Sequence, residues 1–333
     1  MARKWYKGDN HLHTSNSFDG FLTKGQLVDE CKKAGLDFMI ITDHNVNSVN
    51  QSYFDGDMLV IQGQELTDEL GHVNVWGKKV PFEPPYALNC AEDYDKIISA
   101  CKEDGAIISL NHPFCSNCGF KLDMEAYPFD CVEVWNTIQH SDNMKNRDWW
   151  VSQLLKGNKI GAVGGSDFHR NQFGIPLLAM PTTIVHAESK SEKDILDALV
   201  QGRSVITNSP KSSMIYMTYG DANIGDTVKL NPDKKLQIKI TNIKKGHTLK
   251  VFNNDKLIYE NKASKKSALF MAEVDVKETG FVRAEITYRF NPIIEKIYAF
   301  AENTFLSKQG VKDTVSYTLP DFLWAFTNPI WLE

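Results

Sequence analysis

The sequence lacks any apolar run close to the roughly 18 residues that a membrane-spanning helix needs. Its first residues, MARKWYKGDNH, are basic, but the apolar segment of a secretory signal does not follow them. The six cysteines show no spacing typical of an extracellular disulfide framework. We therefore expect a cytoplasmic protein that has no membrane partner.

An excess of positive charge is also absent. Lys and Arg total 37 against 42 acidic residues, which gives a net charge of −5. Because binding to nucleic-acid phosphates needs a basic surface, we expect no nucleic-acid partner. With 42% hydrophobic and 24% charged residues, the chain is not a disordered tail, and its 333 residues predict roughly two domains.

Several common catalytic motifs are missing as well. The chain has no P-loop, no G-x-G-x-x-G and no G-x-S-x-G, which argues against a nucleotide cradle and a serine hydrolase. Histidine, in contrast, is concentrated: eight of the nine histidines precede residue 208. Histidine combined with acidic residues in one segment is the composition of a metal site, although surface solubility alone also favours acidic residues.

Residues 1–207 repeat one unit, an amphipathic helix that ends at glycine and leads into an apolar strand. The four predicted helices are QLVDECKKA, AEDYDKIISACKED, MKNRDWWVSQLLK and SEKDILDALVQ. Glycine just past the last helical turn is a common C-cap, and continuous apolar strands are typical of strands buried on both faces. This alternation predicts an α/β fold with a parallel sheet or barrel.

The pattern changes near Pro210. Short alternating segments follow, among them KLQIKIT, TLKVFN, KLIYE, SALFMAEVDV and FVRAEITYRF, and turn residues separate them. We expect an antiparallel β-sandwich of roughly seven or eight strands with almost no helix. The predicted domains are therefore 1–209 and 210–333.

Metal-ligand side chains follow the predicted strands of the first domain. Because the carboxyl ends of barrel strands meet at one face, these side chains should converge there. Isolated histidine pairs are usually incidental, but so many at equivalent positions predict a site for several cations, which would offset the cost of burying imidazoles and carboxylates. The residues concerned are His11, His13, Asp43, His44, Glu65, His72, His112, Asp167 and His169.

The motifs also carry a family resemblance. In order, HLHTSNSFDG, TDHN, GQEL, GHVNVWG, NHP and GGSDFH resemble those of the PHP (polymerase and histidinol phosphatase) superfamily over residues 9–207. GHVNVWG together with a C-terminal domain ending in TNPIWLE is most similar to the CehA/McbA-type branch of metallohydrolases. The resemblance implies a distorted (β/α)7 barrel holding two or three metals, followed here by the smaller all-β sandwich domain.

The resemblance also implies three ligand sets. The first metal would be held by His11, His13, Glu65 and Asp167; Glu65 would bridge to a second metal held by His72 and His112; Asp19, His44 and His169 would hold a third. This chain departs from the usual family spacing because Phe18 is inserted before Asp19. Only slack in the loop can then deliver the Asp19 carboxylate.

The predicted chemistry is metal-dependent hydrolysis. Imidazoles and carboxylates suit divalent Zn, Mn or Fe, and a water shared by two such ions becomes hydroxide near neutral pH. The resemblance implies a phosphoesterase that acts on a small phosphorylated molecule. Two alternatives stay open: hydrolysis of a carbamate, ester or amide, and a binding protein whose β-sandwich recognises a glycan or a partner.

Other polar residues have two interpretations each. Asp43 could serve catalysis by orienting a neighbour or could be structural. Arg170 could clamp a phosphate or be an ordinary surface residue. Cys115 and Cys118 could form a redox pair, supply thiol ligands or be plain loop thiols, and we favour the last. Pocket-lining candidates are Asn111, Trp135 and Asn136.

Overall fold

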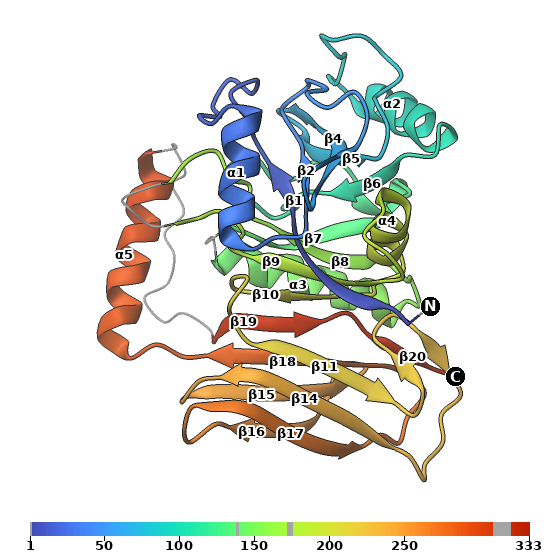
Figure 1. The fold of residues 1–333 in the computed structure, drawn as a ribbon, viewed down its shortest axis with the longest axis vertical. Helices are drawn as coiled ribbons and strands as arrows, with labels where there is room; N and C mark the ends of the chain where they lie inside the picture. The colour runs from blue at the N-terminus through green and yellow to red at the C-terminus, as the bar shows by residue number, and fades with distance from the viewer. Residues whose placement is uncertain (1, 138–139, 172–175, 309–320) are drawn as a thin grey trace.

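The computed structural model describes residues 2–137, 140–171, 176–308 and 321–333 (Figure 1). A curled mixed sheet with helices around it forms the upper part of the molecule, and stacked antiparallel strands form the lower part. No helix within these ranges is long and apolar enough to cross a membrane.

The sheet of the upper part runs in the order β9-β1-β2-β4-β5-β6-β7-β8. It comprises β1 (Lys4–Leu12), β2 (Phe38–Ile41), β4 (Met58–Asp68), β5 (Gly71–Trp76), β6 (Ile107–Leu110), β7 (Cys131–Asn136), β8 (Gly161–Gly165) and β9 (Thr182–Ala187), with β3 (Tyr53–Asp55) pairing to β4. The sheet curls, because Leu12, at the end of β1, forms a parallel bridge with Phe168, just after β8. The carboxyl ends of β1 and β8 therefore lie together.

All four helices predicted for the first domain are present. They are α1 (Lys24–Ala34), α2 (Ala91–Glu103), α3 (His140–Leu155) and α4 (Glu192–Val200). The Thr23 side chain caps α1 in a capping box with Gln26, and the Ser191 side chain caps α4. The glycines that end the predicted helices lie just beyond these elements.

The mixed α/β fold is confirmed, but in place of the predicted distorted (β/α)7 barrel the sheet forms a curled half-barrel. β5 runs antiparallel to both β4 and β6, because only two residues connect β4 to β5 and so short a connection makes a hairpin. No α-helix occupies residues 42–57, and residues 111–130 contain only the 3-10 helix η1 (Met124–Ala126).

The second part contains the predicted alternating strands in two sheets. One sheet is antiparallel and consists of β11 (Met214–Tyr219), β12 (Ala222–Asn223), β14 (Lys235–Ile243) and β17 (Ser267–Asp275). The other includes β13 (Thr227–Val228), β15 (His247–Asn253), β16 (Lys256–Lys262), β18 (Gly280–Tyr288), β19 (Phe322–Thr327) and β20 (Ile330–Leu332). Alternate residues of β14 and β15 are buried in one common core.

The second sheet also joins the two parts of the molecule. β10 (Ser204–Thr207) pairs antiparallel with both β9 and β19, so hydrogen bonding continues from residues 1–209 into 210–333. The ring of Trp150 in α3 lies 5.9 Å from that of Phe326 in β19. The two parts therefore share packing, and the boundary near Pro210 stays a prediction.

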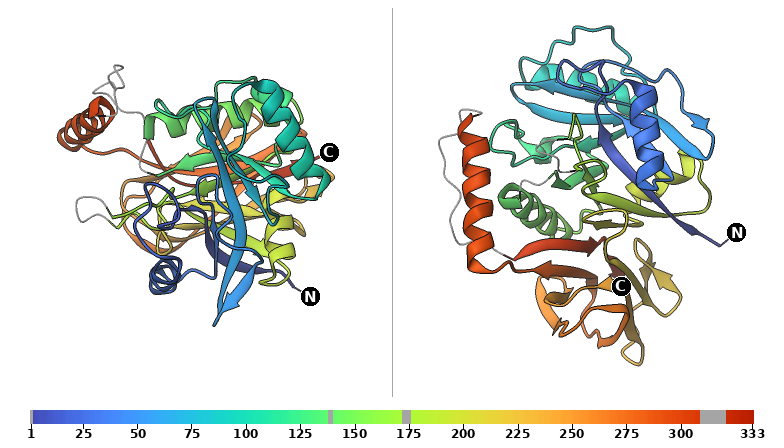
Figure 2. Two further views of the ribbon diagram at one scale, coloured as in Figure 1. Left: turned by 90° about the horizontal axis from the view of Figure 1, so that it is seen from above. Right: turned by 60° about the vertical axis from the view of Figure 1, so that its left-hand side comes forward.

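The expectation that residues 210–333 contain almost no helix is wrong. Helix α5 (Pro292–Lys308) runs along the outside of the molecule (Figures 1 and 2). Asn291 caps it by accepting hydrogen bonds from the amides of Ile293 and Ile294. The sequence signal was an Asn-Pro start followed by apolar residues at helical spacing, Ile293, Ile297 and Phe300.

Candidate metal centre

The structure brings together all nine side chains that the resemblance implies as metal ligands. They come from the carboxyl ends of β1 and β8, from the loops after β1, β2 and β6, and from the β4–β5 hairpin. We call this set the histidine–carboxylate cluster: His11, His13, Asp19, His44, Glu65, His72, His112, Asp167 and His169.

Glu65 lies at the middle of the cluster and is fully buried. Its carboxylate oxygens lie 2.8 Å from His44 Nδ1, 3.1 Å from His72 Nδ1 and 3.2 Å from His11 Nε2. The Nε2 atoms of His13 and His112 are each 3.6 Å away. One carboxylate thus faces five imidazoles, which is the arrangement expected of a group shared between cations.

Asp167 forms a second centre of contacts. Its Oδ1 lies 3.1 Å from His13 Nε2, 3.4 Å from His11 Nε2 and 3.6 Å from His169 Nδ1, and its Oδ2 lies 3.9 Å from His112 Nε2. Glu65 and Asp167 therefore both contact the same three histidines, His11, His13 and His112.

Asp19 reaches the cluster despite the insertion of Phe18. Its Oδ2 lies 3.2 Å from His169 Nε2 and its Oδ1 lies 3.5 Å from His44 Nε2. The inserted residue points toward solvent, because Phe18 is 84% exposed. Its ring stacks on the ring of His44, with centroids 5.0 Å apart. Asp19 is itself 39% exposed, so the cluster opens to solvent on this side.

The donor set fits divalent cations. His11 Nε2, His13 Nε2, Asp19 Oδ1, Glu65 Oε2 and Asp167 Oδ1 are buried atoms without a hydrogen-bond partner. Such atoms are costly to bury unless a cation or another group satisfies them. Four groups of three ligand atoms lie within 4.8 Å of one another: His11–His13–Glu65, His11–His112–Asp167, His13–His44–His169 and His72–His112–Cys118.

These groups overlap the implied ligand sets without reproducing them. Cys118, rather than Glu65, accompanies His72 and His112, and Asp19 belongs to none of the four groups. The clusters are therefore consistent with a metal site, whereas the number, identity and exact positions of the ions stay predictions.

Glu133, which is not among the predicted site residues, contacts two members of the cluster, His11 and His112. Its Oε1 lies 3.1 Å from His11 Nδ1, and its Oε2 accepts a hydrogen bond from the His112 amide at 3.1 Å. A Cβ on Gly165 would lie 2.3 Å from Glu133 Oε1 and 2.4 Å from His11 Cβ, so only glycine allows this approach. The sequence signal was a lone carboxylate inside the buried strand CVEVWN.

Asp43 lies beside the cluster in a buried hydrogen-bond network. It accepts hydrogen bonds from the Thr14 amide and hydroxyl, each at 2.6 Å, from Ser17 Oγ at 3.0 Å and from Ser48 Oγ. Ser17 Oγ also lies 3.1 Å from His13 Nδ1. These contacts connect Asp43 to His13 through Ser17, and the catalytic role of Asp43 stays a prediction.

The remaining candidates differ in their surroundings. Asn111 donates to Glu65 Oε1 at 2.8 Å, and Asn136 donates to Asp167 Oδ2 at 3.3 Å. Trp135 packs in the core, and its indole N–H bonds to the Thr137 carbonyl. Arg170 is exposed, and its guanidinium lies over the Phe21 ring at 4.6 Å.

Two ligand-type residues have a strained backbone. His112 has φ of 25° and Asp167 has φ of 50°, values that non-glycine residues rarely adopt. Strain of this kind persists where the surroundings over-determine a conformation, and it is concentrated at functional sites. Here the chain holds both side chains toward the cluster.

The protonation of the cluster reflects its crowding. Burial would lower the pKa of His44, but the neighbouring carboxylates of Asp19 and Glu65 raise it to about 10. Burial would also lower the pKa of His112, but the nearby Glu65 carboxylate raises it to about 9. Burial lowers the pKa of His13 to about 4. Burial opposes ionisation of Glu65, yet His11 and His72 hold its pKa well below the usual range.

We expect cation binding to release protons. At pH 7 the cation-free chain carries protons on His44 and His112, whereas a cation binds neutral imidazole. Both pKa values lie above the unfolded value near 6.5, so their stabilisation of the cation-free chain is complete below pH 6.5 and is lost as the pH rises through about 9 to 10. Apparent affinity for cations should therefore rise between pH 6.5 and 9.

Calorimetric titration of Zn²⁺ in buffers of different ionisation enthalpy measures this release. At least one proton per chain should appear at pH 7 and fewer at pH 10. Proton release that is zero at pH 7 would contradict the protonation pattern.

Cys115 and Cys118 lie beside the cluster, on the loop after β6. Cys118 Sγ is 2.9 Å from Cys115 Sγ and 3.7 Å from His112 Nδ1. The hydrogen bond from Cys118 lowers the pKa of Cys115 to about 6. Cys118 therefore contacts a candidate ligand directly, whereas the interpretation as plain loop thiols stays a prediction.

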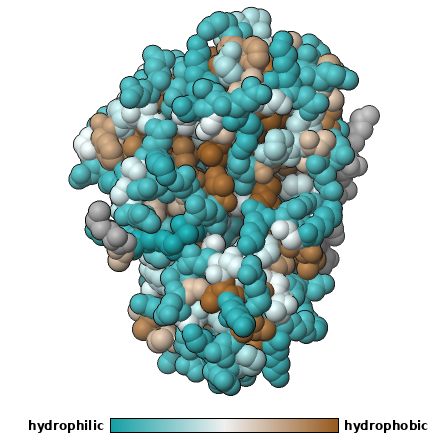
Figure 3. All heavy atoms as spheres, turned by 90° about the vertical axis from the view of Figure 1, so that its right-hand side faces the viewer, coloured by the Kyte–Doolittle hydropathy of each residue, from teal (hydrophilic) through white to brown (hydrophobic). Residues whose placement is uncertain are grey.

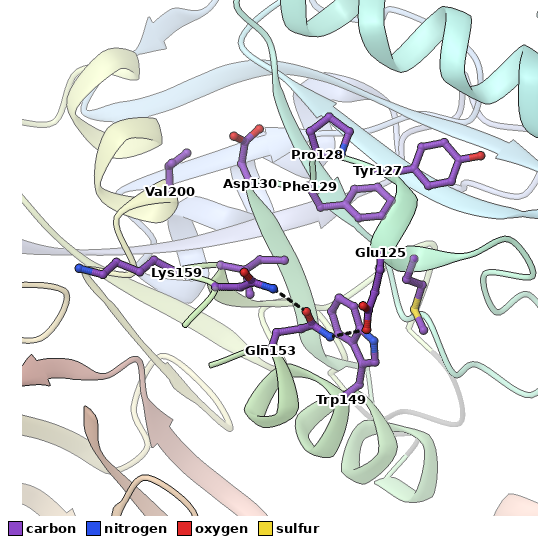
Figure 4. Close-up of a pocket in the computed structure, with 12 residues that line it drawn as sticks. Glu125, Tyr127, Pro128, Phe129, Asp130, Trp149, Gln153, Lys159 and Val200 are labelled. Atoms are coloured by element: carbon purple, nitrogen blue, oxygen red, sulfur yellow. Dashed lines mark hydrogen bonds between the residues drawn. The ribbon is translucent and has the colours of Figure 1, made fainter. Parts of the chain in front are cut away.

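A cavity of about 440 Å³ lies elsewhere and contains none of the nine cluster residues. It is lined by aromatic residues such as Tyr127, Phe129 and Trp149 (Figure 4). Two of its polar side chains are hydrogen-bonded to each other, because Gln153 Nε2 donates to Glu125 Oε1 at 3.2 Å. On the face drawn in Figure 3, hydrophilic side chains predominate, and apolar ones gather near the middle of the upper part.

Comparison with known proteins identifies the fold. No protein-family model and no curated protein matches the sequence. Among solved structures, the chain matches a two-domain protein from Bacteroides vulgatus ATCC 8482 that contains a predicted PHP-like metal-dependent phosphoesterase. The TM-score is 0.50 with 19% identity, over 85% of this chain and 90% of that one. The chain therefore shares the fold of that two-domain protein.

Two further structures are similar over 51% of this chain. A proposed metal-dependent phosphoesterase from Bifidobacterium adolescentis matches with 16% identity and a TM-score of 0.35 over 92% of its own length. An amidohydrolase from Chromobacterium violaceum, with bound sulfate and no metal, matches with 13% identity and a TM-score of 0.35 over 93% of its length.

Proposed function

We propose that this PHP-like protein is a metal-dependent phosphoesterase whose reaction takes place at the histidine–carboxylate cluster. The observation that carries the proposal is the buried Glu65 carboxylate, which three imidazole nitrogens approach within 3.2 Å. Zn, Mn and Fe favour such mixed nitrogen and oxygen ligands. Fold similarity alone does not name a reaction, so the cluster and not the fold is the main support.

The residues present would hold two or three divalent ions. Bound ions would activate water near neutral pH and neutralise the charge that develops on phosphoryl oxygens. Asn111 and Asn136 would fix the orientation of Glu65 and Asp167 through the hydrogen bonds they donate. Glu133 would hold the His11 ring through its Nδ1 atom.

Substrate would approach from the side of Asp19 and His169. Asp19 is 39% exposed, whereas His11, His13 and Glu65 are fully buried. Arg170, exposed and next in sequence to His169, is the cation we assign to binding the substrate phosphate. The substrate is a small phosphorylated molecule in this proposal.

A substrate panel tests the proposed reaction. Chain reconstituted with Mn²⁺ or Zn²⁺ should hydrolyse phosphate monoesters or diesters, and chelated chain should not. If the chain instead hydrolyses carbamates, esters or amides rapidly and leaves phosphate esters intact, the phosphoesterase proposal is wrong and the alternative hydrolase is favoured.

Arg170→Ala should weaken competitive inhibition by inorganic phosphate about tenfold and leave the metal content unchanged. The wild-type inhibition constant should be on the order of millimolar or lower. Steady-state kinetics with increasing phosphate measure the effect. Arg289→Ala is the matched control, because Arg289 is exposed in the other part of the chain and pairs with Glu295. Equal inhibition of the wild type and both variants by phosphate would show that Arg170 does not bind the phosphate.

A further inference from the structure

The two cysteines on the loop after β6 are not used by the proposed hydrolysis. Their sulfur atoms lie 2.9 Å apart, and Cys115 Sγ accepts hydrogen bonds from both the thiol and the amide of Cys118. Both side chains are partly exposed, so small reagents can reach them. Cys31, Cys101 and Cys131 are buried, and Cys90 is exposed.

The backbone of the loop keeps the two sulfurs together. The Cys115 amide donates to the His112 carbonyl at 2.8 Å, and the Gly119 amide donates to the Cys115 carbonyl at 2.9 Å. A Cβ on Gly119 would lie 2.6 Å from the Cys115 carbonyl oxygen, so a glycine is required for this close return of the chain. The Ser116 amide is anchored to Asp142 at 2.9 Å. The sulfur contact is therefore built into the loop.

The same loop connects the thiols to the metal centre. His112 Nε2 lies 3.6 Å from Glu65 and 3.9 Å from Asp167, so it points into the cluster. The other ring nitrogen, Nδ1, is then the atom through which a neighbouring group can fix the orientation of the ring. Cys118 Sγ lies 3.7 Å from that Nδ1 atom. A group that holds the far nitrogen of a ligand histidine fixes its tautomer and strengthens its binding to metal.

We propose that Cys115 and Cys118 form a thiol-oxidation site, and that closing it to a disulfide weakens cation binding through His112. The second half of this proposal rests on the proposed metal centre. In the reduced chain, the Cys118 sulfur accepts a hydrogen bond from His112 Nδ1–H, so Nε2 is the nitrogen that would bind the cation. In the oxidised chain, the sulfur is shared with Cys115, is a poorer acceptor and is drawn away from the ring.

The oxidant is a low-molecular-weight disulfide. The Cys115 thiolate attacks one of its sulfurs, so a Cys115 mixed disulfide forms and one reagent thiolate leaves. Cys118 then loses its proton to solvent and attacks the Cys115 sulfur, which forms the Cys115–Cys118 bond and expels the second reagent thiolate. Two electrons pass from the cysteines to the reagent, and a dithiol reverses the reaction.

The experiment equilibrates the full chain with oxidised and reduced glutathione, alkylates the remaining thiols and maps them by mass spectrometry. A disulfide joining Cys115 and Cys118, reversible by dithiothreitol, is expected. Zn²⁺ affinity, measured by competition with a chromophoric chelator, should fall about tenfold in the oxidised chain. Cys90→Ser should behave as wild type.

Two variants separate the steps. Cys115→Ser keeps Cys118 beside His112, so its Zn²⁺ affinity should match the reduced wild type in either glutathione buffer. Cys118→Ala removes the supporting sulfur, so its affinity should be lowered about tenfold in both buffers. If both cysteines are still alkylated after equilibration in the most oxidising glutathione buffer, the proposed oxidation site is wrong.

Two other results would overturn the link to the metal centre. One is a disulfide that leaves Zn²⁺ affinity unchanged. The other is a thiolate-to-cobalt charge-transfer band in the Co²⁺-loaded chain that Cys118→Ala abolishes, because it would make Cys118 a direct ligand. A chain that binds no Zn²⁺ in any buffer would instead contradict the proposed function. The disulfide mapping would even then show whether Cys115 and Cys118 form a thiol-oxidation site.

Discussion

Replacing Glu65 by alanine should strip two cations from each chain and reduce hydrolysis by about 10³-fold or more. The variant removes the carboxylate that faces five imidazoles, and this is the group that the implied ligand sets share between two cations. Elemental analysis of the purified variant, together with phosphate-release kinetics, measures both effects.

Two comparison variants sharpen this prediction. Glu69→Ala changes an exposed carboxylate on the β4–β5 hairpin and should leave the cation content and the activity unchanged. Asp19→Ala removes a partly exposed group that contacts only His44 and His169 within the cluster, so it should cost at most one cation and part of the activity. Equally mild losses in Glu65→Ala and Asp19→Ala would show that Glu65 is not shared.

Removal of cations from the wild-type chain should lower its melting temperature. Ligands that bind only the folded state stabilise it, by about 4 kcal/mol when present at a thousandfold excess over Kd. For a chain of this size, such a loss corresponds to a shift on the order of 5–10 °C. Calorimetric scans before chelation, after it and after reloading with Mn²⁺ or Zn²⁺ measure the shift.

The Glu65→Ala variant provides the control for this measurement. Because it should lack two of the cations from the start, chelation should change its melting temperature less than that of the wild type. If the wild type melts at the same temperature after elemental analysis has shown complete removal, the cations do not stabilise the fold and the cluster must be held by its ion pairs alone.

Much of the metal centre could be predicted because its residues lie at strand ends. Parallel strands bring their carboxyl ends to one edge, so His13, His112 and Asp167 converge although they are far apart in sequence. The resemblance added Asp19, whose position depends on the loop and which periodicity alone does not indicate. Helices α1, α2, α3 and α4 were predicted from local signals, amphipathic periodicity and a following glycine.

The parts that could not be predicted depend on tertiary contacts. The reversed direction of β5 follows from pairing in the hairpin, whereas its apolar sequence suits a strand of either direction. Glu133 is indistinguishable in sequence from a structural carboxylate until β7 is placed beside β8 and His11. Helix α5 departs from the predicted all-β pattern, and Ile293, Ile297 and Phe300, its apolar residues at helical spacing, are exposed and so belong to no core that the sequence could indicate.

The central claim is that the histidine–carboxylate cluster binds several transition-metal ions. Elemental analysis of the wild-type chain, purified without chelator and then reconstituted with Mn²⁺, Zn²⁺ or Fe²⁺ and freed of excess metal, tests it most directly. The account predicts two or three ions per chain. Fewer than one ion per chain, with no increase after reconstitution, would contradict it.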